Sequence, residues 1–232
     1  KVYKVHKVTG VLRTVFIGSS CCRGQSAPQG STNLMNFMNL IFFVMKKIGI
    51  LGFQGAIIEH ERQIKAIGHE PVIVKYPEQL EEIDGIILPG GESTTMGKIL
   101  NRTGLMEPLR GKIQSGLPVW GTCAGMILLA KELVNDSVTH LGVMDIAVRR
   151  NAYGSQIDSF ATKKVIPAVD SKEIELVFIR APYITSVKDG VKILCELDGH
   201  IVAAEEKNML VTSFHPELTD NTAFLKYFVS KI

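Results

Sequence analysis

One cysteine of this chain stands midway between two glycines, in the stretch Gly121-Thr122-Cys123-Ala124-Gly125. An apolar run, Leu117 to Trp120, precedes it, and apolar residues at helical spacing follow from Met126 to Val134. In a sharp strand-to-helix turn, a β-carbon two residues before or after the apex would collide with the crossing chain, so glycine is favoured there. The pattern therefore predicts such a turn, with Cys123 at its apex.

This position makes Cys123 a candidate nucleophile. A thiol at a helix N-terminus faces unpaired backbone amides and the positive end of the helix dipole, which favour the thiolate. The alternative is a buried structural cysteine in a glycine-rich turn. A cysteine nucleophile needs a base, and the base needs a group that orients it. The choice between a nucleophile and a structural cysteine therefore depends on whether the rest of the sequence supplies these groups.

From Met45 onward, strand and helix signals alternate. The expected strands are 47–52, 71–75 and 84–88, and the expected helices are 58–67 and 77–82. Apolar strands separated by helices predict an α/β fold with a mostly parallel sheet covered on both faces. Loops that carry function are then expected at the carboxyl ends of the strands.

The second half of the chain has a different pattern, with closely spaced strand signals that predict additional antiparallel strands. These candidate strands are 142–148, 163–166, 175–179, 191–196 and 201–204, and a last helix is expected at 221–230.

Charge and length limit the function classes. Of 26 lysines and arginines, five lie in residues 1–44, which hold no acidic residue, leaving 21 against 23 acidic residues in the remainder. This balance, without a basic stripe, argues against nucleic-acid binding. The 232 residues, 46% of them hydrophobic, fit one compact domain.

The clearest boundary lies near residue 45. We interpret residues 1–44 as an extension or leader without fixed structure, and residues 45–232 as the folded domain. The apolar run 34–44 is too short to span a membrane. After residue 45 only Cys123 and Cys195 occur, which predicts no disulfide framework, no metal site and a cytoplasmic protein, with Cys195 as a small core residue.

A candidate base occurs in Phe214-His215-Pro216-Glu217. If this segment is extended, His215 and Glu217 project to the same side, and Glu217 can hold the imidazole tautomer. Taken alone, the tripeptide could equally be a solvated loop. The other histidines after residue 45 stand in polar contexts typical of the surface, without metal-ligand spacing; they are His60, His69, His140 and His200.

The third element is Pro89-Gly90-Gly91-Glu92-Ser93, directly after an expected strand. Paired glycines let backbone amides approach a reacting carbonyl and stabilise its oxyanion, and the amide of Ala124 is the natural second donor. A plain tight turn is the alternative. A phosphate-binding P-loop is disfavoured, because its lysine and spacing are missing.

Together these elements resemble the class I glutamine amidotransferases, whose fold is a flavodoxin-like α/β sheet. Within that class the chain is similar to the glutaminase subunits of pyridoxal 5'-phosphate synthase, the PdxT family. The resemblance covers Met45 to the C-terminus. It is carried by Gly52-Phe53-Gln54-Gly55, Pro77-Glu78-Gln79-Leu80, Leu88-Pro89-Gly90-Gly91-Glu92-Ser93-Thr94-Thr95-Met96, Gly121-Thr122-Cys123-Ala124-Gly125, Arg150-Asn151-Ala152-Tyr153-Gly154, Phe178-Ile179-Arg180-Ala181-Pro182 and Phe214-His215-Pro216-Glu217-Leu218-Thr219.

The resemblance implies a hydrolysis of L-glutamine to glutamate and ammonia through a cysteine thioester. Cys123 would be the nucleophile, His215 the acid and base, and Glu217 the group that orients His215. The residues implied for the oxyanion site are Gly91, Ala124, Gln54 and Gly55. Those implied for glutamine binding are Gly91, Glu92, Ser93, Arg150, Ile179 and Arg180.

The resemblance also implies a protein partner, the synthase subunit of the PdxS family, which would receive the ammonia. It implies no metal, no cofactor and no membrane. Ser155 and Tyr183 depart from the residues common in the family, arginine at the first and histidine or arginine at the second, which leaves local contacts open.

Three other functions are weighed against this one. A class I amidotransferase with another ammonia acceptor is disfavoured by the Gly-Gly-Glu-Ser-Thr-Thr loop together with Arg150-Asn151 and Ile179 to Pro182. A non-catalytic regulatory subunit is disfavoured by the intact Cys123, His215 and Glu217. A stress-type cysteine hydrolase with the same turn would not predict the His-Pro-Glu sequence.

Overall fold

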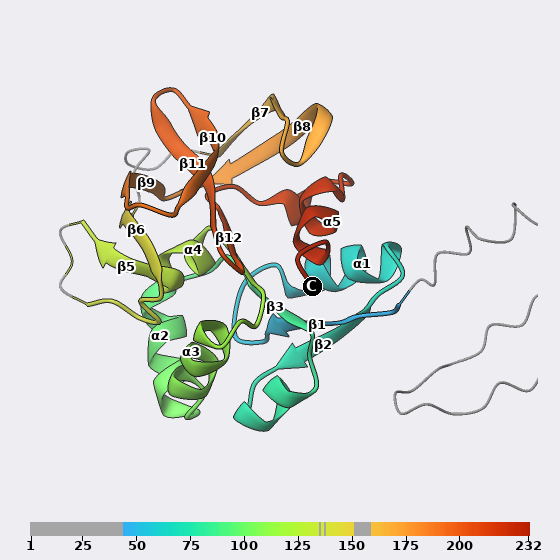
Figure 1. The fold of residues 1–232 in the computed structure, drawn as a ribbon, viewed down its shortest axis with the longest axis vertical. Helices are drawn as coiled ribbons and strands as arrows, with labels where there is room; N and C mark the ends of the chain where they lie inside the picture. Colours follow the sequence, from blue (N-terminus) through green and yellow to red (C-terminus); the bar gives the residue numbers. More distant parts are fainter. Residues whose placement is uncertain (1–43, 135, 137, 151–158) are drawn as a thin grey trace, which may run out of the picture. The chain divides into compact units, whose positions relative to one another are not determined.

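A computed structural model describes residues 44–134, 136, 138–150 and 159–232 (Figure 1). The expectation for the extension, residues 1–44, therefore falls outside the described residues except for Val44, and so does that for Ser155. Elements are labelled as in Figure 1 and lie within these residues.

Five neighbouring strands are parallel and form the central part of the main sheet. In spatial order they are β2 (Glu70–Val74), β1 (Lys47–Leu51), β3 (Gly85–Leu88), β4 (Val119–Thr122) and β12 (Met209–Thr212). Most of their residues are apolar and buried, as expected for strands covered on both faces. The predicted strands of the first half are confirmed, within a residue or two at their ends.

Antiparallel strands extend this sheet beyond β12. They are β11 (His200–Glu206), β9 (Tyr183–Val187) and β6 (Met144–Arg149); β10 (Lys192–Leu197) pairs with β11, and β5 (Ala130–Leu133) pairs parallel with β6. A separate two-stranded antiparallel sheet holds β7 (Ser159–Ile166) and β8 (Asp170–Ile179). The predicted antiparallel second half is confirmed.

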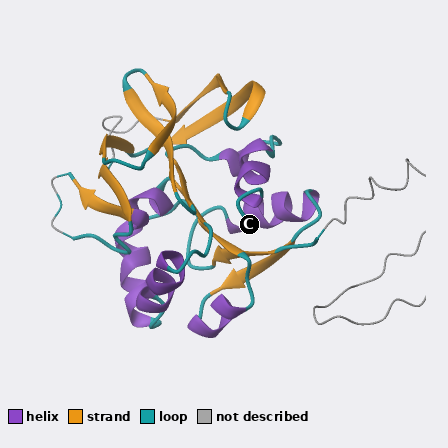
Figure 2. Ribbon diagram, in the orientation of Figure 1, coloured by secondary structure: helices purple, strands orange, loops and turns teal. Residues whose placement is uncertain are grey.

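Helices cover both faces of the sheet (Figure 2). Helices α1 (Ile57–Ala66) and α5 (Ala223–Val229) pack on one core, whose largest side chains include Trp120, Phe214 and Phe228. Helices α2 (Ser93–Arg102), α3 (Met106–Gln114) and α4 (Ala124–Leu129) pack on the other. Two short 3₁₀ helices, η2 (Pro77–Glu81) and η3 (Pro216–Leu218), complete these elements.

Several elements differ from the prediction. The helix expected to run to Val134 ends at Leu129, and residues 130–133 form β5, because the edge of the sheet offers strand pairing to β6. Helices α2 and α3 were not predicted, since Gly97 and Gly111 interrupt their patterns. The short strands β9 and β12 were also missed; β12 is only four residues long although it pairs on both sides.

The predicted turn at Cys123 is present between β4 and α4. Cys123 has φ 48° and ψ −103°, a strained conformation for a residue other than glycine. A β-carbon at Gly121 would lie 2.5 Å from the carbonyl carbon of Gly125, and one at Gly125 would lie 2.0 Å from the carbonyl oxygen of Leu88. Both glycines are therefore required by contacts with backbone atoms.

We expect Gly125→Ala to lower the free energy of unfolding by about 3 kcal/mol or more, because the clashing atom belongs to the backbone of β3. The matched control is Gly111→Ala in α3, where an added β-carbon meets nothing within 4 Å. That change should raise the free energy of unfolding by about 0.5 to 1 kcal/mol. Urea unfolding of both variants checks this, and equal stability would contradict it.

Candidate active site

Four neighbouring parallel strands bring the predicted site together at their carboxyl ends. Gln54-Gly55 follows β1, Gly90-Gly91 follows β3, Cys123 follows β4, and His215 follows β12. Because adjacent parallel strands end at one edge of the sheet, segments as far apart in sequence as 54 and 215 meet there. The arrangement agrees with the expected position of functional loops.

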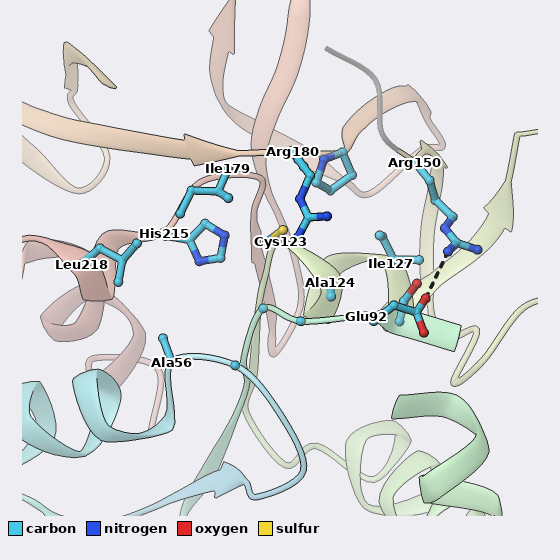
Figure 3. A pocket seen from close by; sticks show the side chains of 15 residues that line it. Ala56, Glu92, Cys123, Ala124, Ile127, Arg150, Ile179, Arg180, His215 and Leu218 are labelled. Carbon is cyan, nitrogen blue, oxygen red and sulfur yellow. Dashed lines mark hydrogen bonds and ion pairs between the residues drawn. The ribbon is translucent and has the colours of Figure 1, made fainter. Parts of the chain in front are cut away.

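A cavity of about 550 Å³ opens at this edge (Figure 3). Cys123, Ala124, His215 and Gly55 line it. So do all the residues that the resemblance implies for glutamine binding: Gly91, Glu92, Ser93, Arg150, Ile179 and Arg180. Of the remaining predicted site residues, Gln54 and Glu217 do not line the cavity but contact residues that do.

Cys123 lines this cavity and has 8% of its surface exposed. Its backbone N–H donates to the carbonyl of Thr212 at 2.8 Å, which ties the turn to β12. Cys195, in contrast, lies in β10 with 4% of its surface exposed, and burial raises the pKa of its thiol. The expectation that Cys195 is a core residue is confirmed.

His215 and Glu217 form a buried pair. His215 Nδ1 lies 2.7 Å from Glu217 Oε1, and the exposed fractions of the two residues are 8% and 0%. The prediction assumed an extended segment, and this is wrong. Residues 216–218 form η3, with His215 at its start. The side chains still meet, because the tight turn brings Glu217 back under His215.

The charges of this pair follow from their surroundings. Burial lowers the pKa of His215, but its interactions with Cys123 and Glu217 outweigh burial and raise the pKa to about 10. Burial alone would raise the pKa of Glu217, but the neighbouring histidines His60 and His215 lower it. The pair is therefore an ionised carboxylate beside an imidazole that readily holds a proton.

The glycine loop after β3 fits closely under these groups. A β-carbon at Gly90 would lie 2.4 Å from the imidazole Cε1 of His215, so only glycine leaves room for the ring. Gly91 has φ +142°. The backbone N–H of Glu92 donates to Gln54 Oε1 at 3.0 Å, which joins the loops after β1 and β3.

Glu92 also begins helix α2. Its carboxylate accepts hydrogen bonds from the backbone N–H groups of Thr94 at 3.0 Å and Thr95 at 2.6 Å. The side-chain hydroxyl of Thr95 contributes most to lowering the pKa of Glu92 to about 2, and the two backbone N–H groups and the side chain of Thr94 lower it further against the opposing effect of burial. The side chain is therefore a permanent negative charge at the rim of the cavity.

Arg150 reaches the same rim from the end of β6. Its guanidinium donates to Asp136 Oδ2 at 3.0 Å, to Glu92 Oε1 at 3.3 Å and to Thr94 Oγ1 at 3.2 Å. These contacts hold the arginine over the cavity, and the role of Asp136 was not predicted. Arg180 follows β8 with φ 44° and also faces the cavity.

The expectation that the other histidines lie at the surface is wrong for three of them. His60, His69 and His140 are buried, with exposed fractions of 1%, 9% and 9%. His60 lies next to Glu217, and no functional role was predicted for this histidine. The sequence feature that could have indicated a role for His60 is its position in α1, one turn before Gln63. The side-chain amide of Gln63 donates to the carbonyls of Pro216 at 3.1 Å and Thr219 at 2.8 Å. Tyr183, the other departure from the family pattern, stacks on His200.

Two kinds of site are absent within the described ranges. No helix there is long and apolar enough to cross a membrane. No group of three or more histidine, cysteine, aspartate or glutamate side chains there could hold a metal ion.

The sheet and the cavity define an α/β domain of the glutamine amidotransferase type, and solved structures agree. A crystal structure of a glutamine amidotransferase superposes with a TM-score of 0.75 at 38% identity, covering 79% of this chain and 97% of that one. A glutamine amidotransferase from Thermotoga maritima, 14% identical, has a TM-score of 0.53 over 80% of this chain and 81% of its own, and shares the fold.

Sequence comparison gives the family. Residues 50–232 match the SNO glutamine amidotransferase family, and the chain belongs to it. Pyridoxal 5'-phosphate synthase subunit PdxT of Clostridium beijerinckii is 61% identical, over 79% of this chain and 96% of its own. The corresponding subunit of Clostridium kluyveri is 59% identical, over 79% of this chain and 98% of its own. The family resemblance predicted from the motifs is confirmed.

We expect iodoacetamide to alkylate Cys123 much faster than Cys195 at pH 7.5. Cys123 lines the cavity beside His215, whereas the raised pKa of Cys195 keeps its thiol protonated. The ratio of rates should be at least about 10², measured by mass spectrometry of the two peptides. Unfolding in urea should abolish the difference; a difference that persists would contradict a structural origin.

Proposed function

We propose that this chain is the glutaminase subunit of a pyridoxal 5'-phosphate synthase, which hydrolyses L-glutamine and supplies ammonia for vitamin B6 biosynthesis. The observation that carries the proposal is the 2.7 Å contact between His215 and Glu217, beside a cysteine on a strained turn. The names of the relatives from the two Clostridium species support the choice of pathway.

In the first step, the thiol proton of Cys123 passes to His215, whose pKa of about 10 keeps the proton on the imidazole, and the sulfur attacks the side-chain amide carbon of glutamine. The carbon–nitrogen bond of the tetrahedral intermediate then breaks, and His215 returns the proton to the leaving ammonia. A glutamyl thioester remains. His215 next takes a proton from water, whose oxygen attacks the thioester. The carbon–sulfur bond then breaks, His215 returns the proton to the sulfur of Cys123, and glutamate is released.

Glu217 keeps His215 in the required tautomer and stabilises the imidazolium that forms in each step. The oxyanion of both tetrahedral intermediates would be stabilised by the backbone N–H groups of Gly91 and Ala124, with Gln54-Gly55 completing the site. This assignment is supported by the packing of the two loops, since a β-carbon at Gly55 would lie 2.0 Å from the carbonyl oxygen of Gly90.

The rim residues suit the two charged ends of glutamine. An arginine can pair bidentately with the α-carboxylate, and Arg150 and Arg180 both line the cavity. The carboxylate of Glu92 suits the α-ammonium group, because its low pKa keeps it charged. Ser93 and Ile179 complete the binding site that we propose.

The partner that we propose is the synthase subunit of the PdxS family, to which ammonia would pass within a complex. The chain itself would need no cofactor and no metal. A cytoplasmic location is expected, because the two cysteines after residue 45 form no disulfide framework. An amidotransferase serving another acceptor is the remaining alternative, and the identity of the stimulating partner distinguishes the two.

We expect the chain to release glutamate from glutamine, faster with the synthase subunit than alone, and Cys123→Ala to lose at least about 10³-fold in kcat because the nucleophile is gone. Cys195→Ala is the matched control and should keep the wild-type rate, since Cys195 lies in β10 outside the cavity. A coupled glutamate dehydrogenase assay measures both. No stimulation by the partner, or full activity of Cys123→Ala, would contradict the proposal.

We expect Glu217→Gln to lower kcat by about 10²-fold or more, because the amide no longer stabilises the imidazolium of His215. The same change should lower the pKa of His215 below its value of about 10, since the carboxylate helps to raise it. The imidazole would then lose its proton at lower pH. NMR titration of the histidine ring measures this shift, and an unchanged pKa would argue against the contact.

A further inference from the structure

We propose that His60 is a positioning residue of this site: a buried, neutral imidazole whose Nε2–H faces Glu217 and holds the carboxylate toward His215. The inference rests on the proposed glutaminase function, because it assigns a role within the same triad. It adds a fourth side chain, from helix α1, behind Cys123, His215 and Glu217.

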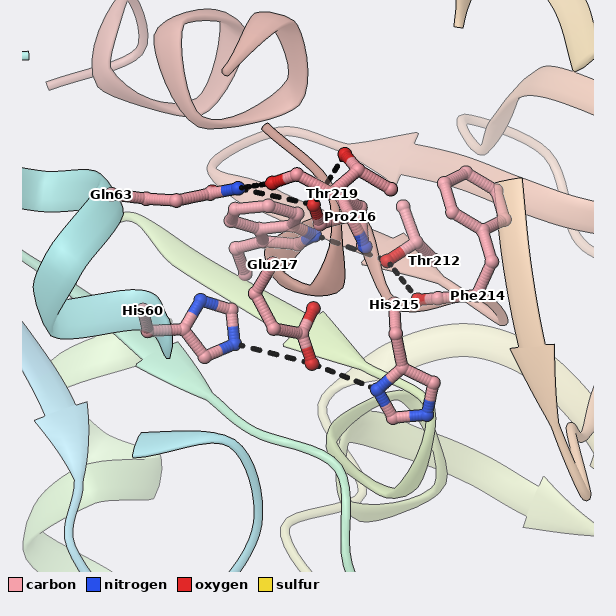
Figure 4. Close-up of polar contacts among 9 residues, drawn as sticks. His60, Gln63, Thr212, Phe214, His215, Pro216, Glu217 and Thr219 are labelled. Carbon is pink, nitrogen blue, oxygen red and sulfur yellow. Dashed lines mark hydrogen bonds and ion pairs between the residues drawn. The ribbon is translucent and has the colours of Figure 1, made fainter. Parts of the chain in front are cut away.

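The geometry places two imidazoles against one carboxylate oxygen. Glu217 Oε1 lies 2.7 Å from His215 Nδ1 and 3.7 Å from His60 Nε2, and Figure 4 shows the two rings on opposite sides of the carboxylate. His60 is 1% exposed and Glu217 is fully buried. In such a water-poor setting, an N–H dipole 3.7 Å from a carboxylate acts far more strongly than it would in water.

His60 has no other polar partner in the described part of the chain. Neither of its ring nitrogens makes a hydrogen bond there, and Oε2 of Glu217 has none either. The ring packs edge-on against Trp120, with centroids 5.8 Å apart at 79°. An apolar side chain would fill this place without burying two polar nitrogens, so packing alone does not explain a histidine here.

The charge state of His60 suits this role. Burial lowers its pKa, and this outweighs the opposing effects of Glu217 and of Glu59 on the same helix, while His215 lowers the pKa further. His60 is therefore neutral at neutral pH and offers one N–H donor. A second cation at this place would compete with His215 for the carboxylate and weaken its hold on the proton; a neutral donor does not.

Helix α1 supports the same turn in a second, separable way. Gln63, one helical turn after His60, donates to the carbonyls of Pro216 and Thr219 and so fixes the backbone of η3. His60 faces the side chain of Glu217 instead. The backbone and the carboxylate of the acidic residue are therefore held from one helix by two different side chains.

The test compares His60→Leu with His60→Gln in the complex with the synthase subunit. Glutamine places an uncharged N–H donor near the position of Nε2, whereas leucine removes the donor and keeps much of the volume. We expect kcat for glutamate release to fall about 10-fold or more in His60→Leu, with KM within about 2-fold of wild type, and to recover to within about 3-fold in His60→Gln.

His69→Leu is the matched control. His69 is also a buried histidine, but it accepts a hydrogen bond from the backbone N–H of Lys46 and lies outside the cavity, so its replacement should leave kcat unchanged. His60→Phe, which keeps a ring against Trp120, replaces His60→Leu if thermal unfolding shows that the leucine variant is not folded.

A second readout does not depend on glutamine hydrolysis. NMR titration should show the pKa of His215 lowered in His60→Leu and restored in His60→Gln, because a less fixed carboxylate stabilises the imidazolium less. The inference would be overturned if His60→Leu kept the wild-type kcat and the wild-type pKa of His215. It would also be overturned if His60→Leu and His60→Gln lost kcat equally. If the wild-type complex releases no glutamate, the proposed function fails, and the titration alone decides the role of His60.

Discussion

The contact between Gly125 and the carbonyl oxygen of Leu88 controls the geometry of the whole edge of the sheet. It lets α4 begin directly against β3, so that Cys123, with its positive φ, projects into the cavity beside the glycine loop. Gly90, in the loop after β3, has a similar effect: because it has no side chain, the ring of His215 fits beside it. Backbone atoms therefore approach more closely here than side chains would permit, and the reactive groups occupy the space that is left.

Two pairs of charged residues lie at this edge of the sheet. The buried carboxylate of Glu217 raises the proton affinity of His215, while the rim carries Glu92 and Arg150 in a mutual contact. Of the inner pair, His215 lines the cavity and Glu217 lies behind it, whereas the outer pair lies at the rim. The first pair is suited to the proton transfers that we propose, and the second to the zwitterionic substrate that we propose, so chemistry and binding would use different parts of one cavity.

Much of this could be predicted from sequence, because its signals are local. The glycines around Cys123 report a steric requirement that only a sharp turn creates, and apolar runs such as 47–51 report strands covered on both faces. Other features depend on distant partners. Residues 130–133 form a strand only because β6 lies beside them. The sequence around His60 is polar and predicts exposure, but in the folded structure η3 brings Glu217 next to this histidine. No spacing along the chain records such contacts.

The position of β12 has a consequence for how the site comes into being. This strand lies between β4 and β11, although it follows β4 by almost ninety residues. Non-local parallel pairing of this kind is slow, because a long loop must close before any contact is gained. Cys123 follows β4 and His215 follows β12, so the two residues meet only where these distant strands pair, and the contact between them depends on a long-range step of folding.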